Sequence, residues 1–419
     1  MPEPLAKRVY ATLRDGGWMT SERARVYVRI IGALTLLDGL AWIALSHGGL
    51  DRLGKPLGAD FVSFWAASKL ALGGHPAAAY DVTAHYAAQR AAFGGYDTGF
   101  AAFFYPPVYL LLCLPLATLP YLASLTAWLG ATGFAYWQVV KRFFGEYAKG
   151  AWLPALAFPA VMCNAGHGQN AFLTTALFGA GALSLSRRPI LAGIFFGALI
   201  FKPHLGILIP VALIAAGRWR AFFSAACTVI GLAAASLAVF GIGTWQAFLK
   251  GSALARIALE QNYVGDEKMQ SAFAAARLWH ASVPVAYGLQ ALMTGLAAVL
   301  VFLLARRRPE GGAEGVALIA AAALASPFLL DYDLMLLAIP LAWVFVQGRR
   351  TGFLPWEKTV LAAAFLLPMV ARLVAGHIGL PLGPPVILAL LLVVVRRGFA
   401  LSAPVERRAP PMTTPALAS

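Results

Sequence analysis

Charged residues are scarce in this chain, and their scarcity excludes an ordinary water-soluble domain. Only 12% of its 419 residues are charged and 60% are hydrophobic, whereas soluble domains are about half apolar and a quarter charged. The apolar residues form runs of about 20, the length at which a helix crosses a hydrocarbon core. Strict alternation of apolar and polar residues, the pattern of a membrane β-barrel, is also lacking. The sequence therefore predicts an all-α polytopic membrane protein.

Cysteine is rare as well, and its placement argues against a metal or disulfide framework. The chain has 3 cysteines. Cys113, Cys163 and Cys227 lie far apart inside apolar runs, without the close spacing of such sites. The 18 acidic residues are scattered along the chain. We therefore expect no cofactor, although the sequence leaves a divalent cation open.

Basic residues outnumber acidic ones and give a net charge of +15. They stand in short clusters between apolar runs: Arg187/Arg188, Arg218/Arg220, Arg306 to Arg308, Arg349/Arg350 and Arg396/Arg397. This is the positive-inside pattern, which sets topology and needs no anionic partner beyond membrane lipids. The chain lacks a surface domain that interleaves aromatic and basic residues, so no nucleic-acid partner is expected.

The apolar and basic segments together predict one membrane domain with both termini in the cytoplasm. Residues 1–25 are expected to form a basic tail, residues 26–397 a single transmembrane domain and residues 398–419 a disordered tail. Long external loops are expected at 47–104 and 241–283. The spans between them add up to about 12 or 14 transmembrane or half-membrane helices.

Prolines interrupt two of the apolar runs. The run from Tyr105 to Val140 contains Leu114-Pro115 and Leu119-Pro120, and the sequence leaves open whether it crosses the membrane once or folds as a hairpin. Between two basic clusters, Lys202-Pro203-His204 splits the run 189–217 into half-helices of roughly 13 residues, each about 20 Å long. This break holds Lys202 and His204 at membrane depth, where broken helices are tolerated if they line a cavity.

Asp60 is the first candidate for chemistry. It follows the first predicted span and precedes a predicted helix at 61–72, which Gly73-Gly74 would end, and Asp81 can cap a second helix reaching about Phe93. A carboxylate at this membrane surface could act as general base on a lipid-carried substrate. The alternative is that Asp60 only caps the helix that follows it.

The other polar candidates also fall on the external side or open towards it. They are Tyr105, His167, Gln169, Asn170, Lys202, His204, Asp331 and Asp333. Polar residues gathered on one face favour an enzyme, whereas a transporter or flippase, the alternative, would place its site at the midplane between repeats.

Each of these candidates has a structural alternative. Lys202 and His204 would grip a donor phosphate, or Lys202 would merely extend to the interface. His167, Gln169 and Asn170 would contact a sugar or its phosphate, or form only a glycine-rich turn. Asp331 and Asp333 would bind sugar hydroxyls, assist the base or hold a cation, or form only a polar turn. Tyr105 would line a lipid groove or belong to the interfacial aromatic belt.

An ordered set of short motifs resembles glycosyltransferase family 87, of the C-type glycosyltransferase superfamily. The motifs are Asp60-Phe61 with Tyr80-Asp81, Tyr105-Pro106-Pro107 with Leu114-Pro115, Gly168-Gln169-Asn170, Ala192-Gly193 with Lys202-Pro203, and Ser326-Pro327 with Asp331-Tyr332-Asp333. They extend over most of the chain. Tyr332-Asp333 stand where mannosyltransferase members would have a histidine pair, which leaves the sugar and the acceptor open.

The resemblance implies a reaction and a location. It implies an enzyme of the bacterial inner membrane that passes a hexose, mannose first, from a polyprenyl-phosphate donor to a lipid or glycan acceptor at the periplasmic face. It implies Asp60 as the general base, with inversion at the anomeric carbon. Lys202 and His204 would then offset the charge of the leaving phosphate.

Overall fold

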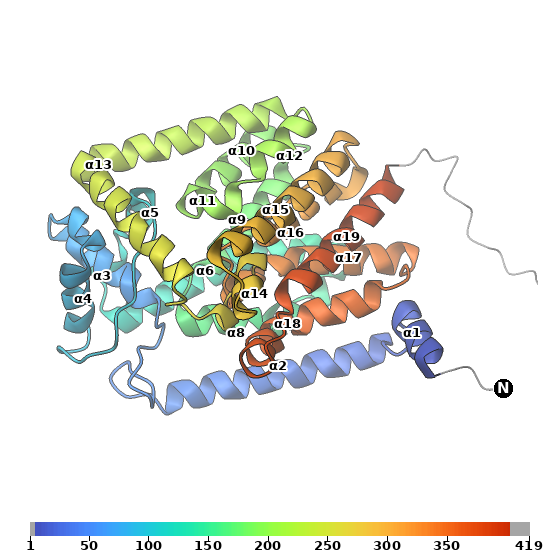
Figure 1. The fold of residues 1–419 in the computed structure, drawn as a ribbon, viewed down its shortest axis with the longest axis horizontal. Helices are drawn as coiled ribbons and strands as arrows, with labels where there is room; N and C mark the ends of the chain where they lie inside the picture. Colours follow the sequence, from blue (N-terminus) through green and yellow to red (C-terminus); the bar gives the residue numbers. More distant parts are fainter. Residues whose placement is uncertain (1–4, 403–419) are drawn as a thin grey trace, which may run out of the picture.

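The computed structural model describes residues 5–402, and over these residues the fold is helical with no β-strand (Figure 1). This confirms the predicted all-α class. Six described segments are long and apolar enough to cross a membrane: α2 (Ser21–Ala44), α13 (Trp219–Glu260), α15 (Val283–Arg306), Asp331–Thr351, α18 (Glu357–Ile378) and α19 (Gly383–Leu401). The chain is therefore an integral membrane protein.

The remaining apolar helices are shorter than a full span. They include α9 (Ala171–Ser184) and α16 (Ala313–Ala325), together with segments broken by proline. Since helices of 10–17 residues need not cross the bilayer, the count of 12 or 14 and the C-type architecture stay predictions.

Both predicted proline breaks are present. The first run divides into α5 (Pro107–Cys113), the 3-10 turn η2 (Leu116–Thr118) and α6 (Tyr121–Phe144). Proline has no N–H to continue a helix, so each break falls at Pro115 or Pro120.

The second break falls at Lys202. The run divides into α10 (Pro189–Ala198), η4 (Leu199–Phe201), α11 (Pro203–Gly206) and α12 (Ile209–Ala215). Lys202 lies between η4 and α11 with non-helical backbone angles, φ −126° and ψ 68°. Lys202 therefore lies outside regular helix, at the junction of two short helices.

The segment 47–104 contains three helical pieces. These are α3 (Phe61–Leu72), which has the predicted bounds, η1 (Pro76–Tyr80) and α4 (Val82–Ala91). The Asp81 carboxylate accepts a hydrogen bond from the Ala84 N–H at 2.8 Å, which confirms the predicted cap of α4. Figure 1 shows these pieces at the opposite end of α2 from α1 (Leu5–Asp15).

Two helices extend past the expected bounds of the membrane domain, 26–397. The expected tail 1–25 contains α1, and α2 begins at Ser21 because the Thr20 hydroxyl accepts the N–H of Arg23 at 3.2 Å. At the other end α19 continues through Leu401, so residues 398–401 are helical; residues 403–419 lie outside the described part of the chain.

The expected loop 241–283 is also partly helical. Gly241, with φ 74°, kinks α13, and the helix then continues to Glu260. The kink falls at the predicted boundary, since only glycine adopts this conformation without strain.

The core lies around α16, whose residues are all buried. Neighbouring helices approach it closely through small residues: a Cβ added at Gly315 would meet Ala182 of α9 at 2.6 Å. Close approach through glycine and alanine is typical of helices packed in membranes. This packing holds α8 (Ala160–His167), α9 and η7 (Asp331–Leu337) side by side, which positions the residues of the site.

Candidate active site

Asp60 lies at the N-terminal end of α3, but its side chain does not cap that helix. Among the described residues, its carboxylate makes no capping hydrogen bond, and the helix-cap alternative is wrong for this side chain. One carboxylate oxygen, Oδ2, instead accepts from Gln169 Nε2 at 3.1 Å. The backbone N–H of Asp60 donates to the carbonyl of His167 at 2.9 Å, which ties the start of α3 to the end of α8.

Gln169 is the centre of the hydrogen-bonded network. Its Nε2 donates to Asp60 and, at 3.2 Å, to the hydroxyl of Tyr332. Its Oε1 accepts from the hydroxyl of Tyr105 at 3.1 Å and from the backbone N–H of Asn170 at 3.0 Å. All four hydrogen-bonding positions of the amide are occupied. Gln169 therefore has one orientation, with Nε2 towards Asp60 and Tyr332 and Oε1 towards Tyr105.

Gly168 brings this glutamine close to α3. It ends α8 in the left-handed conformation, with φ 65°. An added Cβ would lie 2.5 Å from Cβ of Phe61 and 2.9 Å from the Leu125 side chain. Any other residue would force α3 and the turn apart, because no L side chain fits that space.

Lys202 pairs with Asp333 inside the protein. Their Nζ and Oδ1 atoms are 2.6 Å apart, and both side chains are buried. Nζ also lies 5.3 Å from the centre of the Tyr332 ring. Lys202 therefore does not extend to the interface, and that alternative is wrong. A buried pair of this kind is costly unless its geometry is good.

Asp331 has a different cation beside it. Its Oδ2 lies 3.9 Å from Arg372 of α18, and its Oδ1 accepts from the backbone N–H of Tyr332 at 2.8 Å. The His167 ring lies 5.6 Å from the Tyr332 ring and is oriented by a bond between Nδ1 and the carbonyl of Cys163 at 2.8 Å. Tyr332 thus contacts groups of both α8 and the broken helix.

His204 and Asn170 are placed differently from the rest. His204 Nδ1 is bonded to the Ser326 hydroxyl at 2.7 Å, so it joins the Ser326-Pro327 segment rather than Gln169. The amide of Asn170 is fully buried, and both its polar atoms are without a partner within residues 5–402. The hydroxyl of Tyr109 is buried and unpartnered in the same way.

The structure brings together most of the predicted residues and adds two. Tyr332 and Arg372 belong to the network, although neither was predicted as a site residue. Tyr332 lies between Asp331 and Asp333, and this position in the sequence was the sign that it could belong to the site. Arg372 is in the middle of an apolar run, where an ionisable residue marks function by default.

The arrangement can support proton abstraction by a carboxylate. Asp60 is partly exposed, and its carboxylate is hydrogen-bonded to a neutral amide. Two further carboxylates are each beside a cation. Over residues 5–402, no group of three His, Cys, Asp or Glu residues could hold a metal ion.

Comparison with protein families settles the class of protein. The model of glycosyltransferase family 87 matches residues 103–330, more than half of the chain. The chain belongs to glycosyltransferase family 87. No curated protein and no solved structure gives a significant match.

Family membership makes this protein a membrane-bound glycosyltransferase, and it favours the enzyme over the transporter or flippase alternative. The matched region contains Tyr105, Gln169 and Lys202, whereas Asp60 precedes it and Asp331 and Asp333 follow it. Any role for these three aspartates therefore depends on the geometry of the site.

Proposed function

We propose that this family 87 glycosyltransferase transfers a hexose, mannose first, from a polyprenyl-phosphate donor to a lipid or glycan acceptor at the periplasmic face of the bacterial inner membrane. The observation that carries the proposal is the Asp60 carboxylate, which accepts a hydrogen bond from the buried amide of Gln169. A lipid-linked donor suits a site built from membrane helices, because its tail can stay in the bilayer.

Asp60 is the general base in this proposal. It takes the proton of the acceptor hydroxyl while that oxygen forms a bond to the anomeric carbon of the donor. The bond from that carbon to the phosphate oxygen breaks, and polyprenyl phosphate leaves with the electron pair. Attack from the side opposite the phosphate inverts the configuration.

Lys202 supplies positive charge to the leaving phosphate in the same proposal. The ammonium group is buried at the break between η4 and α11, where few water molecules would weaken its field. Asp333 holds this group in place before substrate binds. His204, on the same turn, reaches the segment before Asp331 through Ser326.

The test is transfer from radiolabelled polyprenyl-phosphate mannose in membranes that contain the wild type or Asp60→Asn. We expect the variant to lose at least about a hundredfold in rate, the usual contribution of a general base. Asp81→Asn is the matched control: it alters an aspartate in the same segment that only caps α4, and asparagine caps equally well.

Three outcomes separate the parts of the proposal. Equal rates for the wild type and Asp60→Asn would remove Asp60 from the chemistry. Transfer from glucose or arabinose donors alone would correct the sugar. Transfer from nucleotide sugars alone would refute the polyprenyl-phosphate donor.

A further inference from the structure

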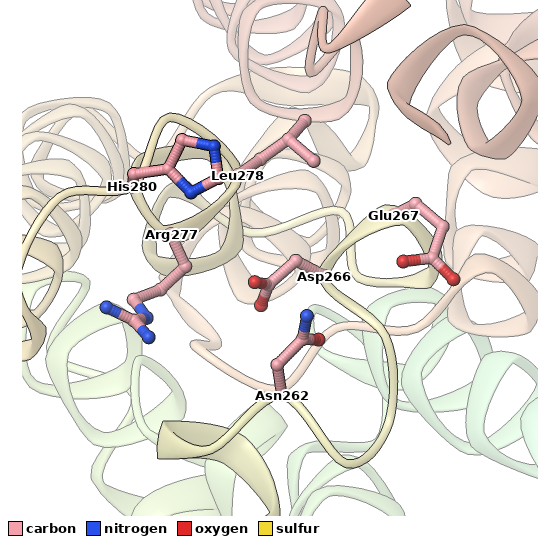
Figure 2. Close-up of a pocket in the computed structure, with 6 residues that line it drawn as sticks. All are labelled: Asn262, Asp266, Glu267, Arg277, Leu278 and His280. Atoms are coloured by element: carbon pink, nitrogen blue, oxygen red, sulfur yellow. The ribbon is translucent and has the colours of Figure 1, made fainter. Parts of the chain in front are cut away.

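A polar cavity lies in the segment after α13, outside the network around Asp60. Its volume is about 340 Å³, within the range of small-molecule sites. The cavity is lined by Asn262, Asp266, Glu267, Arg277, Leu278 and His280 (Figure 2). These residues come from the end of α13, from η5 (Asp266–Lys268) and from α14 (Ala272–Leu278) with the residues after each.

Two polar groups in this cavity are unsatisfied. Asp266 is only 7% exposed, and its Oδ1 has no hydrogen-bond partner in the described part of the chain. Nε of Arg277 is buried without a partner in the same residues, while its NH1 donates to the carbonyl of Ala281 at 2.7 Å. Buried polar atoms are nearly always paired, so exceptions of this kind call for a ligand or water.

Figure 2 shows how the side chains are directed. Asp266, Asn262 and Arg277 surround one space, and Glu267 lies on the side of Asp266 that is opposite to Arg277. Asn262 and His280 both have φ 58°, in the left-handed region that side chains seldom adopt. Both residues lie in turns beside the cavity, one after α13 and one after α14.

Two contacts connect the segment that lines the cavity to the segments of Asp331 and Arg372. The N–H of Gln270 donates to the carbonyl of Leu329 at 2.7 Å, two residues before Asp331. The Glu267 side chain packs on Gly376 of α18. Gly376 lies one helical turn, about 6 Å, beyond Arg372, which pairs with Asp331.

The lining is suited to hydroxyl groups. Asp266 offers an acceptor, Arg277 offers a donor, and the Asn262 amide offers both. A hydroxyl can donate to the first and accept from the second. Asp266 and Glu267 would repel an anion, and Arg277 would repel a cation.

We propose that this cavity binds a sugar ring of the acceptor, through hydroxyl groups that bridge Asp266 and Arg277. This inference rests on the proposed function, since the acceptor must reach Asp60 while its other sugars are held nearby. The cavity is the acceptor subsite, and the donor is bound at the Lys202 side of the network.

The first test is binding without turnover. Saturation-transfer NMR with the purified full chain in detergent would measure a panel of methyl glycosides of mannose, glucose, galactose and arabinose. We expect at least one glycoside to bind, and Asp266→Asn to weaken its binding about tenfold through the loss of one charged hydrogen bond. Lys268→Gln is the matched control, because Lys268 belongs to the same turn η5 but does not line the cavity, and we expect it to leave binding unchanged.

The outcomes distinguish failure of the proposed subsite from failure of the proposed function. Absence of binding by every glycoside, or equal binding by Asp266→Asn, Arg277→Gln and the wild type, would overturn the subsite. So would displacement of a bound glycoside by inorganic phosphate or Mg²⁺ at this cavity. Glycoside binding that needs Asp266, combined with no transfer from any polyprenyl-phosphate donor, would keep the subsite and refute the proposed function.

A kinetic test applies once transfer is detected. Asp266→Asn should raise KM for the acceptor about tenfold and leave KM for the donor unchanged. An equal change in both constants would indicate general damage to the fold and contradict the subsite.

Discussion

Asp60 differs from the other two aspartates of the site in its neighbours. Asp331 and Asp333 lie within salt-bridge distance of Arg372 and Lys202, whereas the Asp60 carboxylate is bonded to the neutral amide of Gln169. Asp331 and Asp333 are also buried, whereas the Asp60 side chain is partly exposed and can be reached by an acceptor hydroxyl. Of the three, Asp60 is therefore the one best suited to accept a proton.

The ion pair between Lys202 and Asp333 leads to a prediction at the residue scale. Lys202→Met should destabilise the protein by about 3–5 kcal/mol, because it leaves a buried carboxylate without its partner. Lys202→Met with Asp333→Leu should recover most of that stability, since neither charge is then buried alone. Thermal unfolding in detergent would measure both.

Measuring sugar transfer by the same variants distinguishes a structural role of the ion pair from a catalytic role of Lys202. If Lys202 stabilises the leaving phosphate, the double variant stays inactive despite its recovered stability. Recovery of transfer together with stability would show that the pair is structural only.

At the scale of elements, α3 is held by the segment that follows it. The buried ring of His85 in α4 is bonded through Nε2 to the Ser63 carbonyl at 3.0 Å. Its Nδ1 lies 3.2 Å from the amide nitrogen of Gln89, and that amide is fixed by bonds to both backbone groups of Ala101. Ser63 in turn donates its hydroxyl to the carbonyl of Asp60 at 2.8 Å.

This arrangement predicts a loss of stability in acid. Burial lowers the pKa of His85 from 6.5 to about 4, although the bond to Ser63 opposes the change. As the pH falls below 6.5, His85 becomes protonated in the unfolded chain but stays neutral in the folded chain until the pH approaches 4. The free energy of unfolding should therefore fall between pH 6.5 and 4, by about 3 kcal/mol.

The control for this prediction is His85→Gln, whose amide can replace both hydrogen bonds but does not titrate. Unfolding of the two proteins would be followed against pH in the same detergent. The variant should lose less stability than the wild type over this range. Parallel curves would exclude His85 as the cause.

For the whole molecule, the orientation in the membrane can be measured. With the three native cysteines replaced by alanine, Ala91→Cys and Ser186→Cys place single thiols on exposed positions of α4 and of the turn after α9. A membrane-impermeant maleimide should label the first thiol in intact spheroplasts and the second only after permeabilisation. The reverse pattern would place Asp60 on the cytoplasmic side.

Composition and proline placement were enough to predict much of the molecule. The helical class, the breaks at Pro115, Pro120 and Lys202, and the bounds of α3 follow from local properties: run length, the missing N–H of proline and the glycines after Leu72. The boundaries at Thr20 and Leu401 were missed. The cap is a local hydrogen bond of the Thr20 hydroxyl, and α19 continues past its last apolar run because its backbone hydrogen bonds extend to Ser402.

The pairing of side chains was decided by tertiary structure alone. Gln169 reaches Asp60 because Gly168 lets α8 and α3 approach, and Lys202 meets Asp333 because the break at Lys202 faces η7. Neither partner is near the other in sequence. By itself the sequence determined where polar groups enter the membrane domain, since each is costly there. The tertiary structure determined which of these polar groups pair with each other, since pairing depends on distances that are set by the packing of helices far apart in the sequence.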